Sequence, residues 1–498
     1  MLVNEHTRAP ATTPTARRPV IAISVALFGI LLALSPWYGY YRDELYFRLL
    51  GEQPALGYFD TPPLTPMIAR ASITIFGDNV VALRIFPAMI ASLVVVLVAL
   101  ICRELGGGRN AQVLAAVGAA TSSMVLVAGH TLLTLSLDLA LWTAATLFTL
   151  RALVRSDGRW WFAVGAVAGL ATYNRHLILL LIIGVGTGIL LAGPRTVLRD
   201  KRLWAAALLA VLIALPNLWY QLTNDWPQAQ MVDALKEWNG PRNLALFAPL
   251  QILLLGPPLA IIAAAGLLRL WRDPRLRCFA IAYPVACALV LYSAGRADYL
   301  FGLHLLMFAA GCEPTVRWLS TSTRRRNLLV ASVTLNAILT ALPVLPLVPP
   351  PAAAGTPLFA LNEVPRESIG WPQFVTQVAT VVRNLPPDDR AKAVILAQNY
   401  GQAGILDRYA KDFGLPHIYS GHNELYFRGS PPESARVVVT ITKEPARQAT
   451  PFFTSCTEQG HIDNGIGLDN QEDGKLILVC RDPIRPWSEM WPEFRKHN

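Results

Sequence analysis

The stretch VVALRIFPAMIASLVVVLVALI, residues 80–101, decides the class of fold. It contains one charged residue, Arg84. As a helix it is long enough to cross a bilayer, which takes about 20 apolar residues. The stretch therefore predicts a membrane-spanning helix.

Runs of the same kind recur on both sides of it. By the length criterion we expect about eleven spans, centred on residues 20–38, 80–101, 111–129, 132–153, 160–174, 177–193, 203–220, 244–268, 278–294, 299–318 and 327–347. The first run lacks a small-residue cleavage site, which indicates an uncleaved anchor. Of the 498 residues 53% are hydrophobic and 15% charged, against about 25% charged in soluble proteins. This excludes a wholly soluble enzyme, a disordered chain and a disulfide scaffold, and predicts a polytopic α-helical membrane protein.

The distribution of basic residues predicts an orientation. With a cytoplasmic N-terminus, the inside loops carry 20 Lys and Arg and the outside positions carry 8. Cytoplasmic loops are richer in Lys and Arg, so this favours a multi-pass protein of the plasma (inner) membrane. An odd number of spans then places the C-terminal region outside the cytoplasm. The basic excess lies in the loops between spans, which argues against a nucleic-acid partner.

The character of the chain changes after residue 348. We divide it into a transmembrane domain at 1–348, whose first outer loop is 39–79, a linker at 349–357, and a soluble extracytoplasmic α/β domain at 358–498. In that domain we expect strands at 393–400, 417–421, 435–442 and 475–480, and a helix at 402–414 that ends at Gly414. Its two cysteines, Cys456 and Cys480, are expected to form a disulfide in an oxidising compartment.

The first outer loop is the most informative segment for function. It is about 40 residues long, and long ordered loops are often functional. Asp43 and Glu44 follow the first span directly. A carboxylate there is near a low-dielectric region, which can shift its pKa to a value suited to general-base catalysis. Asp60 follows in GYFDTPP. The alternative is an acidic pair solvated by lipid headgroups. The apolar positions of the loop suit helices that lie in the membrane interface.

An ordered set of motifs resembles the bacterial membrane glycosyltransferases of family 39, relatives of the protein O-mannosyltransferases and of the lipid A aminoarabinose transferase. The motifs are YRDELYFRLL (41–50), GYFDTPPLTPMIAR (57–70), LRIFPA (83–88), CRELGGGRNAQ (102–112), LTLSLDLALW (133–142), GLATYNRH (169–176), PNLWYQLTNDWPQAQ (216–230), GRADYL (295–300), LAQNYGQAGILDRY (396–409) and GLPHIYSGHNELYFRG (414–429). They cover nearly the whole chain. The resemblance implies a GT-C fold.

The resemblance also implies a reaction. Such enzymes pass a sugar from a polyprenyl-phosphate carrier to a protein, lipid or polysaccharide acceptor on the outer face. The aspartate of the first loop is the proposed general base, which here is Asp43, with Glu44 beside it. A single displacement inverts the anomeric centre. Asp60 and Tyr58 of the loop, and Asp138 within the fourth span, are the candidates for orienting acceptor or sugar, since a carboxylate inside a span is costly and often functional.

The leaving group is a phosphate, so the resemblance also implies cations near the outer ends of the spans. Candidates are Arg175, where relatives often have Lys, together with His176, Arg296 and His130. Arginine binds phosphate in a bidentate manner, so the exchange keeps the role. The alternative for these arginines, and the favoured one for Arg70 and Arg84, is a side chain that reaches to lipid headgroups. Aromatic residues of the soluble domain, Tyr400 among them, could stack on sugars, although such residues are usually core.

Two further questions remain open in the sequence. Some GT-C enzymes use a divalent metal. Asp43 and Asp60 alone would supply few of the ligands that such an ion needs. We therefore expect that no metal or other cofactor is required. The main alternative function is a transporter or flippase for lipids or lipid-linked sugars. That class typically shows inverted repeats with broken spans at matching positions, which this sequence lacks. A catalytically silent scaffold for envelope synthesis is the third hypothesis.

Overall fold

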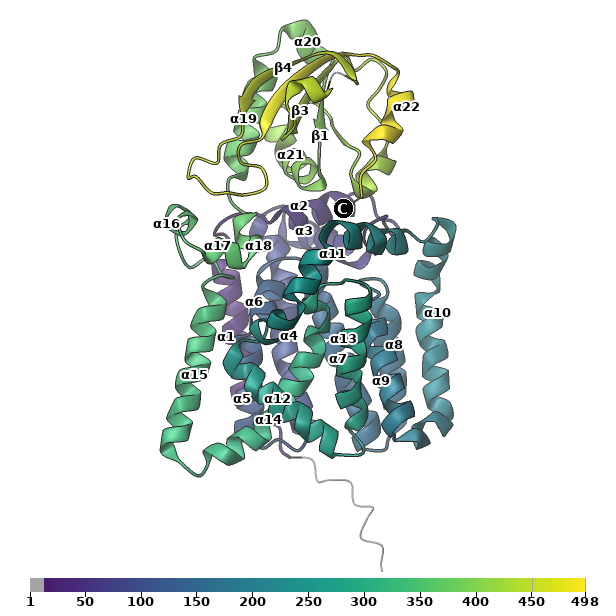
Figure 1. The fold of residues 1–498 in the computed structure, drawn as a ribbon, viewed down its shortest axis with the longest axis vertical. Helices are drawn as coiled ribbons and strands as arrows, with labels where there is room; N and C mark the ends of the chain where they lie inside the picture. The colour runs from purple at the N-terminus through teal and green to yellow at the C-terminus, as the bar shows by residue number, and fades with distance from the viewer. Residues whose placement is uncertain (1–12, 450, 498) are drawn as a thin grey trace, which may run out of the picture. The chain divides into compact units, whose positions relative to one another are not determined.

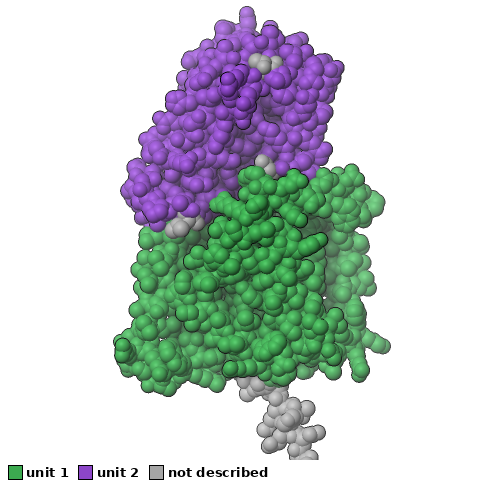
Figure 2. Space-filling view, in the orientation of Figure 1, with its two compact units in different colours: residues 1–34, 61–65, 84–345 green, residues 35–60, 66–83, 346–498 purple. Residues whose placement is uncertain are grey.

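A computed structural model describes residues 13–449 and 451–497. The chain forms two compact units (Figure 2): unit 1 is residues 1–34, 61–65 and 84–345, and unit 2 is residues 35–60, 66–83 and 346–498. Most of the first loop therefore belongs to the same unit as the C-terminal region, whereas the sequence placed it with the transmembrane domain. Residues 1–12, the expected cytoplasmic N-terminus, lie outside the described residues.

Unit 1 is helical, and its long helices run side by side in Figure 1. Its elements are α1 (Arg17–Leu34), most of α4 (Val80–Glu104), α5 (Arg109–Ala120), α6 (Ser123–His130), α7 (Thr134–Val154), α8 (Trp160–Ala171), α9 (Ile178–Ala192), η2 (Arg195–Arg199), α10 (Lys201–Thr223), α11 (Pro227–Leu253), α12 (Pro257–Arg272), α13 (Arg277–Tyr292), η3 (Ala297–Leu300), α14 (Phe301–Leu319) and α15 (Thr323–Ala341).

Each predicted run contains a helix, but not every helix is long and apolar enough to span a bilayer. Within the described residues five pass that test: α1, α4, α7, α10 and η3 with α14. The bent pairs α5–α6 (59°) and α11–α12 (87°) raise the number to seven if each pair is one span. Helices α8, α9 and α13 are shorter, and α15 begins with three arginines. The prediction of a polytopic helical membrane protein is thus confirmed. The number of helices that pass this test, five to seven, is smaller than the expected eleven spans.

Small residues bring the helices of unit 1 into close contact. Gly165 of α8 lies against the backbone of Ala206 in α10, and Gly188 of α9 lies against Cys278 in α13. Gly311 of α14 likewise faces the backbone of Ile262 in α12. A side chain at any of these glycines would collide with the neighbouring helix. Such contacts are typical of membrane helices, whose association depends on close packing.

Unit 2 contains a five-stranded mixed sheet of order β2-β1-β3-β5-β4. The strands are β1 (Ala393–Ala397), β2 (Ile418–Ser420), β3 (Val437–Thr442), β4 (Phe453–His461) and β5 (Leu476–Pro483). Strand β1 is parallel to β2 and β3, whereas β5 is antiparallel to β3 and β4. The helices are α2 (Arg42–Gly51), most of α3 (Leu64–Phe76), α16 (Pro350–Ala354), α17 (Leu358–Leu361), α18 (Glu363–Arg366), α19 (Trp371–Arg383), α20 (Pro387–Ala391), α21 (Tyr400–Phe413), η4 (Asn423–Arg428), η5 (Ala446–Ala449), α22 (Trp487–Met490) and η6 (Trp491–Phe494).

The four predicted strands and the predicted helix of this domain are present. The helix, α21, is capped by the Asn399 side chain and ends at Gly414, which has the left-handed conformation that glycine favours. The sequence did not indicate β4, because that edge strand is polar and mostly exposed. The segment expected to be a linker contains α16, and its Ala353 packs in an apolar cluster with Phe359, Ile369 and Leu468.

The first loop forms two helices, as expected, but α2 does not present its apolar residues to a membrane interface. Residues 44–51 are all buried within unit 2, and α2 packs against α21. Gly404 of α21 makes this contact close, since a Cβ there would lie 2.9 Å from the backbone of Leu45. Along α3, by contrast, Met67, Ile75 and Phe76 are exposed.

Candidate functional site

The candidate residues from the sequence divide between the two units. Unit 2 contains Asp43, Glu44, Tyr58 and Asp60, and unit 1 contains Asp138, Arg175 and the other residues expected to bind phosphate.

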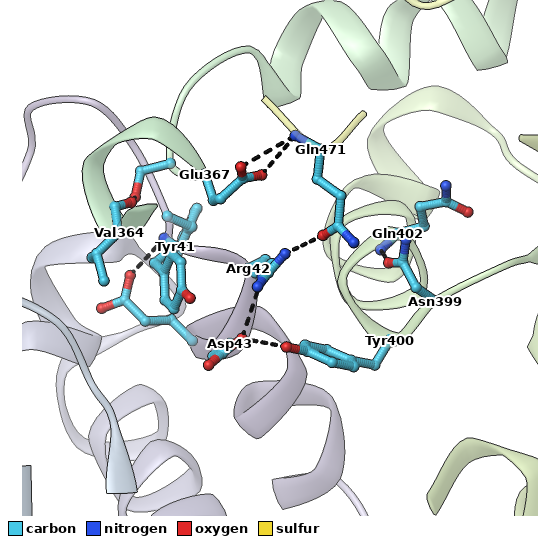
Figure 3. A network of polar contacts seen from close by, with 12 residues as sticks. Tyr41, Arg42, Asp43, Val364, Glu367, Asn399, Tyr400, Gln402 and Gln471 are labelled. Atoms are coloured by element: carbon cyan, nitrogen blue, oxygen red, sulfur yellow. Dashed lines mark hydrogen bonds and ion pairs between the residues drawn. The ribbon is translucent and has the colours of Figure 1, made fainter. Parts of the chain in front are cut away.

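Asp43 lies in the first turn of α2, within a polar network that joins α2 to the C-terminal part of unit 2 (Figure 3). The Tyr400 hydroxyl donates to Asp43 Oδ1 at 2.9 Å, and Arg42 Nε lies 3.7 Å from the same oxygen. Arg42 donates in turn to the side chain of Gln471. The Asp43 side chain is 25% exposed. The carboxylate is therefore held in a defined place by a tyrosine and an arginine while remaining accessible.

Glu44 and Tyr58 stabilise the ends of α2. Glu44 is fully buried, and its Oε2 accepts from the Tyr41 backbone N–H at 2.8 Å. An acid at the third helical position that binds back to the N-cap is typical of helix capping. The Tyr58 hydroxyl is 3.1 Å from both Leu50 O and Gln53 O, at the other end of the helix. These contacts give both residues a structural role at the ends of α2.

Asp60 lies in a second polar group of unit 2. Its Oδ1 accepts from the Tyr46 hydroxyl at 2.8 Å, and its Oδ2 is 3.4 Å from Asn423 Nδ2. The Tyr46 ring is 4.8 Å from the Tyr400 ring between centroids. Loss of solvent raises the pKa of the Asp60 carboxyl to about 7, and the charges of Glu424 and Asp43 act in the same direction, although the bond from Tyr46 opposes them. Asp60 therefore titrates near neutral pH.

This raised pKa predicts a pH-dependent stability. Between about pH 4 and pH 7 the folded chain keeps a proton on Asp60 that the unfolded chain has lost, so the free energy of unfolding falls as the pH rises through that window. We expect the thermal unfolding temperature of purified protein to fall from pH 5 to pH 8, and to fall less in Asp60→Asn. The exposed-site control Asp412→Asn should follow the wild type. Equal pH slopes for wild type and Asp60→Asn would contradict the assignment.

In unit 1, Arg175 and Asp138 each have a buried polar atom that no described residue satisfies. Arg175 Nη1 and Asp138 Oδ1 are buried, and neither has a hydrogen-bond partner among residues 13–449 and 451–497. The turn that carries Arg175 is held by its neighbour: Asn174 Nδ2 donates to Thr134 O at 2.8 Å, and Thr65 Oγ1 donates to Asn174 Oδ1 at 2.8 Å. A buried guanidinium nitrogen without an acceptor is costly unless a ligand supplies one. This is the chemistry of an anion site.

The GRADYL segment lies next to the same arginine. The Arg175 guanidinium is 5.7 Å from the centroid of the Tyr299 ring, within cation–π range. Arg296 Nε donates to Asp298 Oδ1 at 2.8 Å, and the Arg296 side chain is 57% exposed. The structure thus brings Arg175 next to GRADYL, and it gives Arg296 a carboxylate partner, Asp298, that sequence reasoning did not single out.

The two predicted histidines have protein partners. His130 Nε2 is 3.3 Å from Arg84 Nη1, so the buried Arg84 contacts a histidine. This contact differs from the lipid headgroups that we favoured for Arg84. His176 Nε2 is 2.9 Å from Asn217 Oδ1 of α10. Arg70 Nη1 donates to Gly51 O at 3.1 Å, at the end of α2, which also differs from a headgroup contact.

Two other expectations concern metal ligands and cysteines. Within residues 13–449 and 451–497, no group of three or more His, Cys, Asp or Glu side chains is arranged to hold a metal ion. Cys456 of β4 and Cys480 of β5 face each other across neighbouring strands and form a disulfide, the pairing expected from the sequence.

Sequence reasoning missed Tyr46 and Asn423, which bind Asp60, and the amides Asn217 and Gln221 on α10. Tyr46 and Asn423 lie in motifs that the sequence marked, ELYFR and GHNELYFRG, but nothing local to them indicates a carboxylate partner. Asn217 and Gln221 lie in PNLWYQ, and their spacing of four residues was an available signal for a shared helix face.

Two comparisons of sequence show which known proteins this chain resembles. Residues 60–220 match the model of a protein family described as "dolichyl-phosphate-mannose-protein mannosyltransferase". The lipid A galacturonosyltransferase RgtD of Rhizobium johnstonii is 25% identical over 250 residues, which are 48% of this chain and 51% of that protein. The match thus spans about half the length of this curated relative.

Solved structures share the fold. ArnT of Cupriavidus metallidurans in the apo state has a TM-score of 0.58 at 13% identity, over 92% of this chain and 96% of that one. The same protein bound to undecaprenyl phosphate has a TM-score of 0.61 at 15% identity, over 92% and 97%. At these identities the likeness concerns the fold.

Proposed function

We propose that this chain, a relative of the membrane glycosyltransferases of the dolichyl-phosphate-mannose-protein mannosyltransferase family with an ArnT-like fold, transfers a sugar from a polyprenyl-phosphate carrier to a lipid A-type glycolipid on the outer face of the plasma membrane. The N-terminus is then cytoplasmic and unit 2 lies on the outer side.

The observation that carries the proposal is the buried Nη1 of Arg175, which lies in a helical membrane unit and has no hydrogen-bond partner in the described part of the chain. A lipid-linked sugar phosphate supplies the anion that this nitrogen lacks. The choice of carrier is supported by the ArnT structure that holds undecaprenyl phosphate, and the choice of acceptor by RgtD, which is named for lipid A. The sugar itself is left open.

The proposed reaction is a single displacement at the anomeric carbon. The acceptor hydroxyl oxygen forms a bond to that carbon as the bond from the carbon to the phosphate oxygen breaks. The hydroxyl proton passes to Asp43, and polyprenyl phosphate leaves with the electron pair. The anomeric centre inverts because one displacement takes place.

The other residues position Asp43 or bind the donor. Tyr400 and Arg42 hold the Asp43 carboxylate in place. Arg175, with Arg296 beside it in the GRADYL segment, binds the donor phosphate. His176 and His130 are positioning residues: His176 orients the Asn217 side chain, and His130 orients the Arg84 side chain. Asp138 orients the sugar, while Glu44 and Tyr58 stabilise α2.

The test uses purified full-length protein in liposomes, with a panel of labelled undecaprenyl-phosphate sugars and lipid A as acceptor. We expect one donor to be consumed and its label to appear on lipid A with inverted anomeric configuration. Movement of a donor across the bilayer without consumption would instead support the flippase. No donor consumption with lipid A or with a whole envelope extract would overturn the proposal.

A chelator tests the expectation that no metal is required. The described acidic residues do not form a metal cluster, and the proposed mechanism uses arginine to neutralise the phosphate charge. We therefore expect transfer in excess EDTA to stay within about twofold of the untreated rate. A loss of activity in EDTA that Mg²⁺ or Mn²⁺ restores would show that a metal takes part.

A further inference from the structure

Helix α10 has a polar strip on its protein-facing side. Apolar residues along the helix are exposed, as expected for contact with lipid: Leu208, Val211, Leu212, Leu215 and Trp219 are each 48–66% exposed. The buried residues of the helix are Ala206, Ala214, Asn217 and Gln221. Near the C-terminal end of a membrane helix, therefore, two amides point into the protein. Polar side chains at such positions are expensive and usually functional.

In both amides the oxygen has a hydrogen-bond partner, whereas the nitrogen has none within residues 13–449 and 451–497. Asn217 is fully buried and Gln221 is 2% exposed. Asn217 Oδ1 accepts from His176 Nε2 at 2.9 Å, and Gln221 Oε1 accepts from the Gln228 backbone N–H at 3.3 Å. Asn217 Nδ2 and Gln221 Nε2 are buried without a partner among the residues that the structure describes. Four residues apart, they lie on one face of the helix, so they form a pair of unused donors.

This pair belongs to the same part of unit 1 as Arg175. The Tyr173 hydroxyl donates to Ile213 O at 2.7 Å, one turn before Asn217, and His176 binds Asn217 itself. Two hydrogen bonds thus tie α10 to the turn that carries Arg175. Arg175 Nη1 is also a buried donor to which no residue in the described ranges offers an acceptor. Three unsatisfied donors on two connected segments need a ligand rich in acceptors, because buried donors without partners are rare and costly.

We infer that Asn217 and Gln221 bind hydroxyl oxygens of the donor sugar, while Arg175 binds the phosphate to which that sugar is attached. The inference rests on the proposed function and extends it to the sugar. The division of roles follows from charge: a guanidinium matches a phosphate, whereas neutral amides match neutral hydroxyl groups. A site built to hydrogen-bond hydroxyl groups rejects ligands that lack them, so these two amides determine which sugar is accepted.

The test compares two ligands that differ only in the sugar: undecaprenyl phosphate and the glycosylated undecaprenyl phosphate that the wild type consumes. Binding is measured by calorimetric titration of full-length protein in nanodiscs. Gln221→Met keeps the side-chain volume and removes the donor. We expect this variant to bind the glycosylated ligand about 10-fold more weakly than the wild type does. Its affinity for undecaprenyl phosphate should stay within about twofold of the wild-type value. Asn217→Leu should act in the same direction, and Arg175→Ala should weaken both ligands.

Matched variants separate binding from folding. Thr223→Ala changes an exposed residue of the same helix and should bind both ligands as the wild type does. Gln221→Leu also removes the amide donor without adding a charge, so it serves if Gln221→Met unfolds. If the Gln221 and Asn217 variants bind the glycosylated ligand with unchanged affinity, or lose affinity for both ligands equally, the inference is overturned. A wild type that binds undecaprenyl phosphate but consumes no glycosylated donor would instead count against the proposed function.

Discussion

Asp43→Asn protein is expected to lose sugar transfer by about a thousandfold, because general-base catalysis by a positioned side chain contributes about 10²–10⁴-fold. Asparagine cannot accept the hydroxyl proton, but its Oδ1 can still accept from Tyr400, so the network around α2 should persist. Donor affinity and thermal unfolding temperature should stay close to those of the wild type. The measurement is the single-turnover rate with the donor identified from the panel, with binding titrated in parallel.

Glu52→Gln is the matched control for this variant. Glu52 follows α2, and its side chain is 43% exposed beside Arg48. We expect its transfer rate to lie within about twofold of the wild-type rate, since it is remote from the Asp43 carboxylate contacts. Wild-type transfer by a folded Asp43→Asn protein would remove Asp43 as the base. Equal loss in Glu52→Gln would show that the effect comes from disturbance of α2.

Arg175→Ala is expected to weaken donor binding by about 10–100-fold, since a hydrogen bond to a charged group contributes about 1.5–3 kcal/mol. Both undecaprenyl phosphate and its glycosylated form should be affected, because the phosphate is common to them. The transfer rate at saturating donor should fall less than the affinity. Arg175→Lys should restore part of the binding, since lysine keeps the charge and loses the bidentate geometry.

The matched control here is Arg272→Ala, which removes an exposed arginine at the end of α12. It should bind donor as the wild type does. If Arg175→Ala is folded and binds undecaprenyl phosphate with wild-type affinity, Arg175 does not contact the phosphate. The buried nitrogen would then need a different acceptor.

Comparison of sequence and structure shows which features are local. Apolar periodicity, helix capping and turn chemistry act over a few residues. They predict the transmembrane helices, the β1–α21–β2 segment and the end of α21 at Gly414. The edge strand β4 was missed because its polar residues carry no such pattern. The length test gives fewer spans than the expected eleven because α8, α9 and α13 are short and α15 carries three arginines in its first turn. The bent pairs α5–α6 and α11–α12 pass the test only if each pair is one span.

The candidate site depends more on tertiary structure. The motifs pointed to Asp43, Asp60 and Arg175, because charged residues beside membrane spans are conspicuous in any sequence. The partner of Asp43, however, is Tyr400, 357 positions away. Such pairings form when the chain brings α2 against α21, and no local pattern encodes them.

By itself, then, the sequence determined that this is a helical membrane protein with an α/β domain, and it singled out the charged residues worth testing. Only the tertiary structure decided what each of them touches. It assigned Glu44 to a helix cap, buried α2 within unit 2, and turned Asn217 and Gln221 inward with their amide nitrogens unsatisfied. The physical reason is that apolar burial is patterned along the chain, whereas hydrogen-bond partners are set by packing between distant segments.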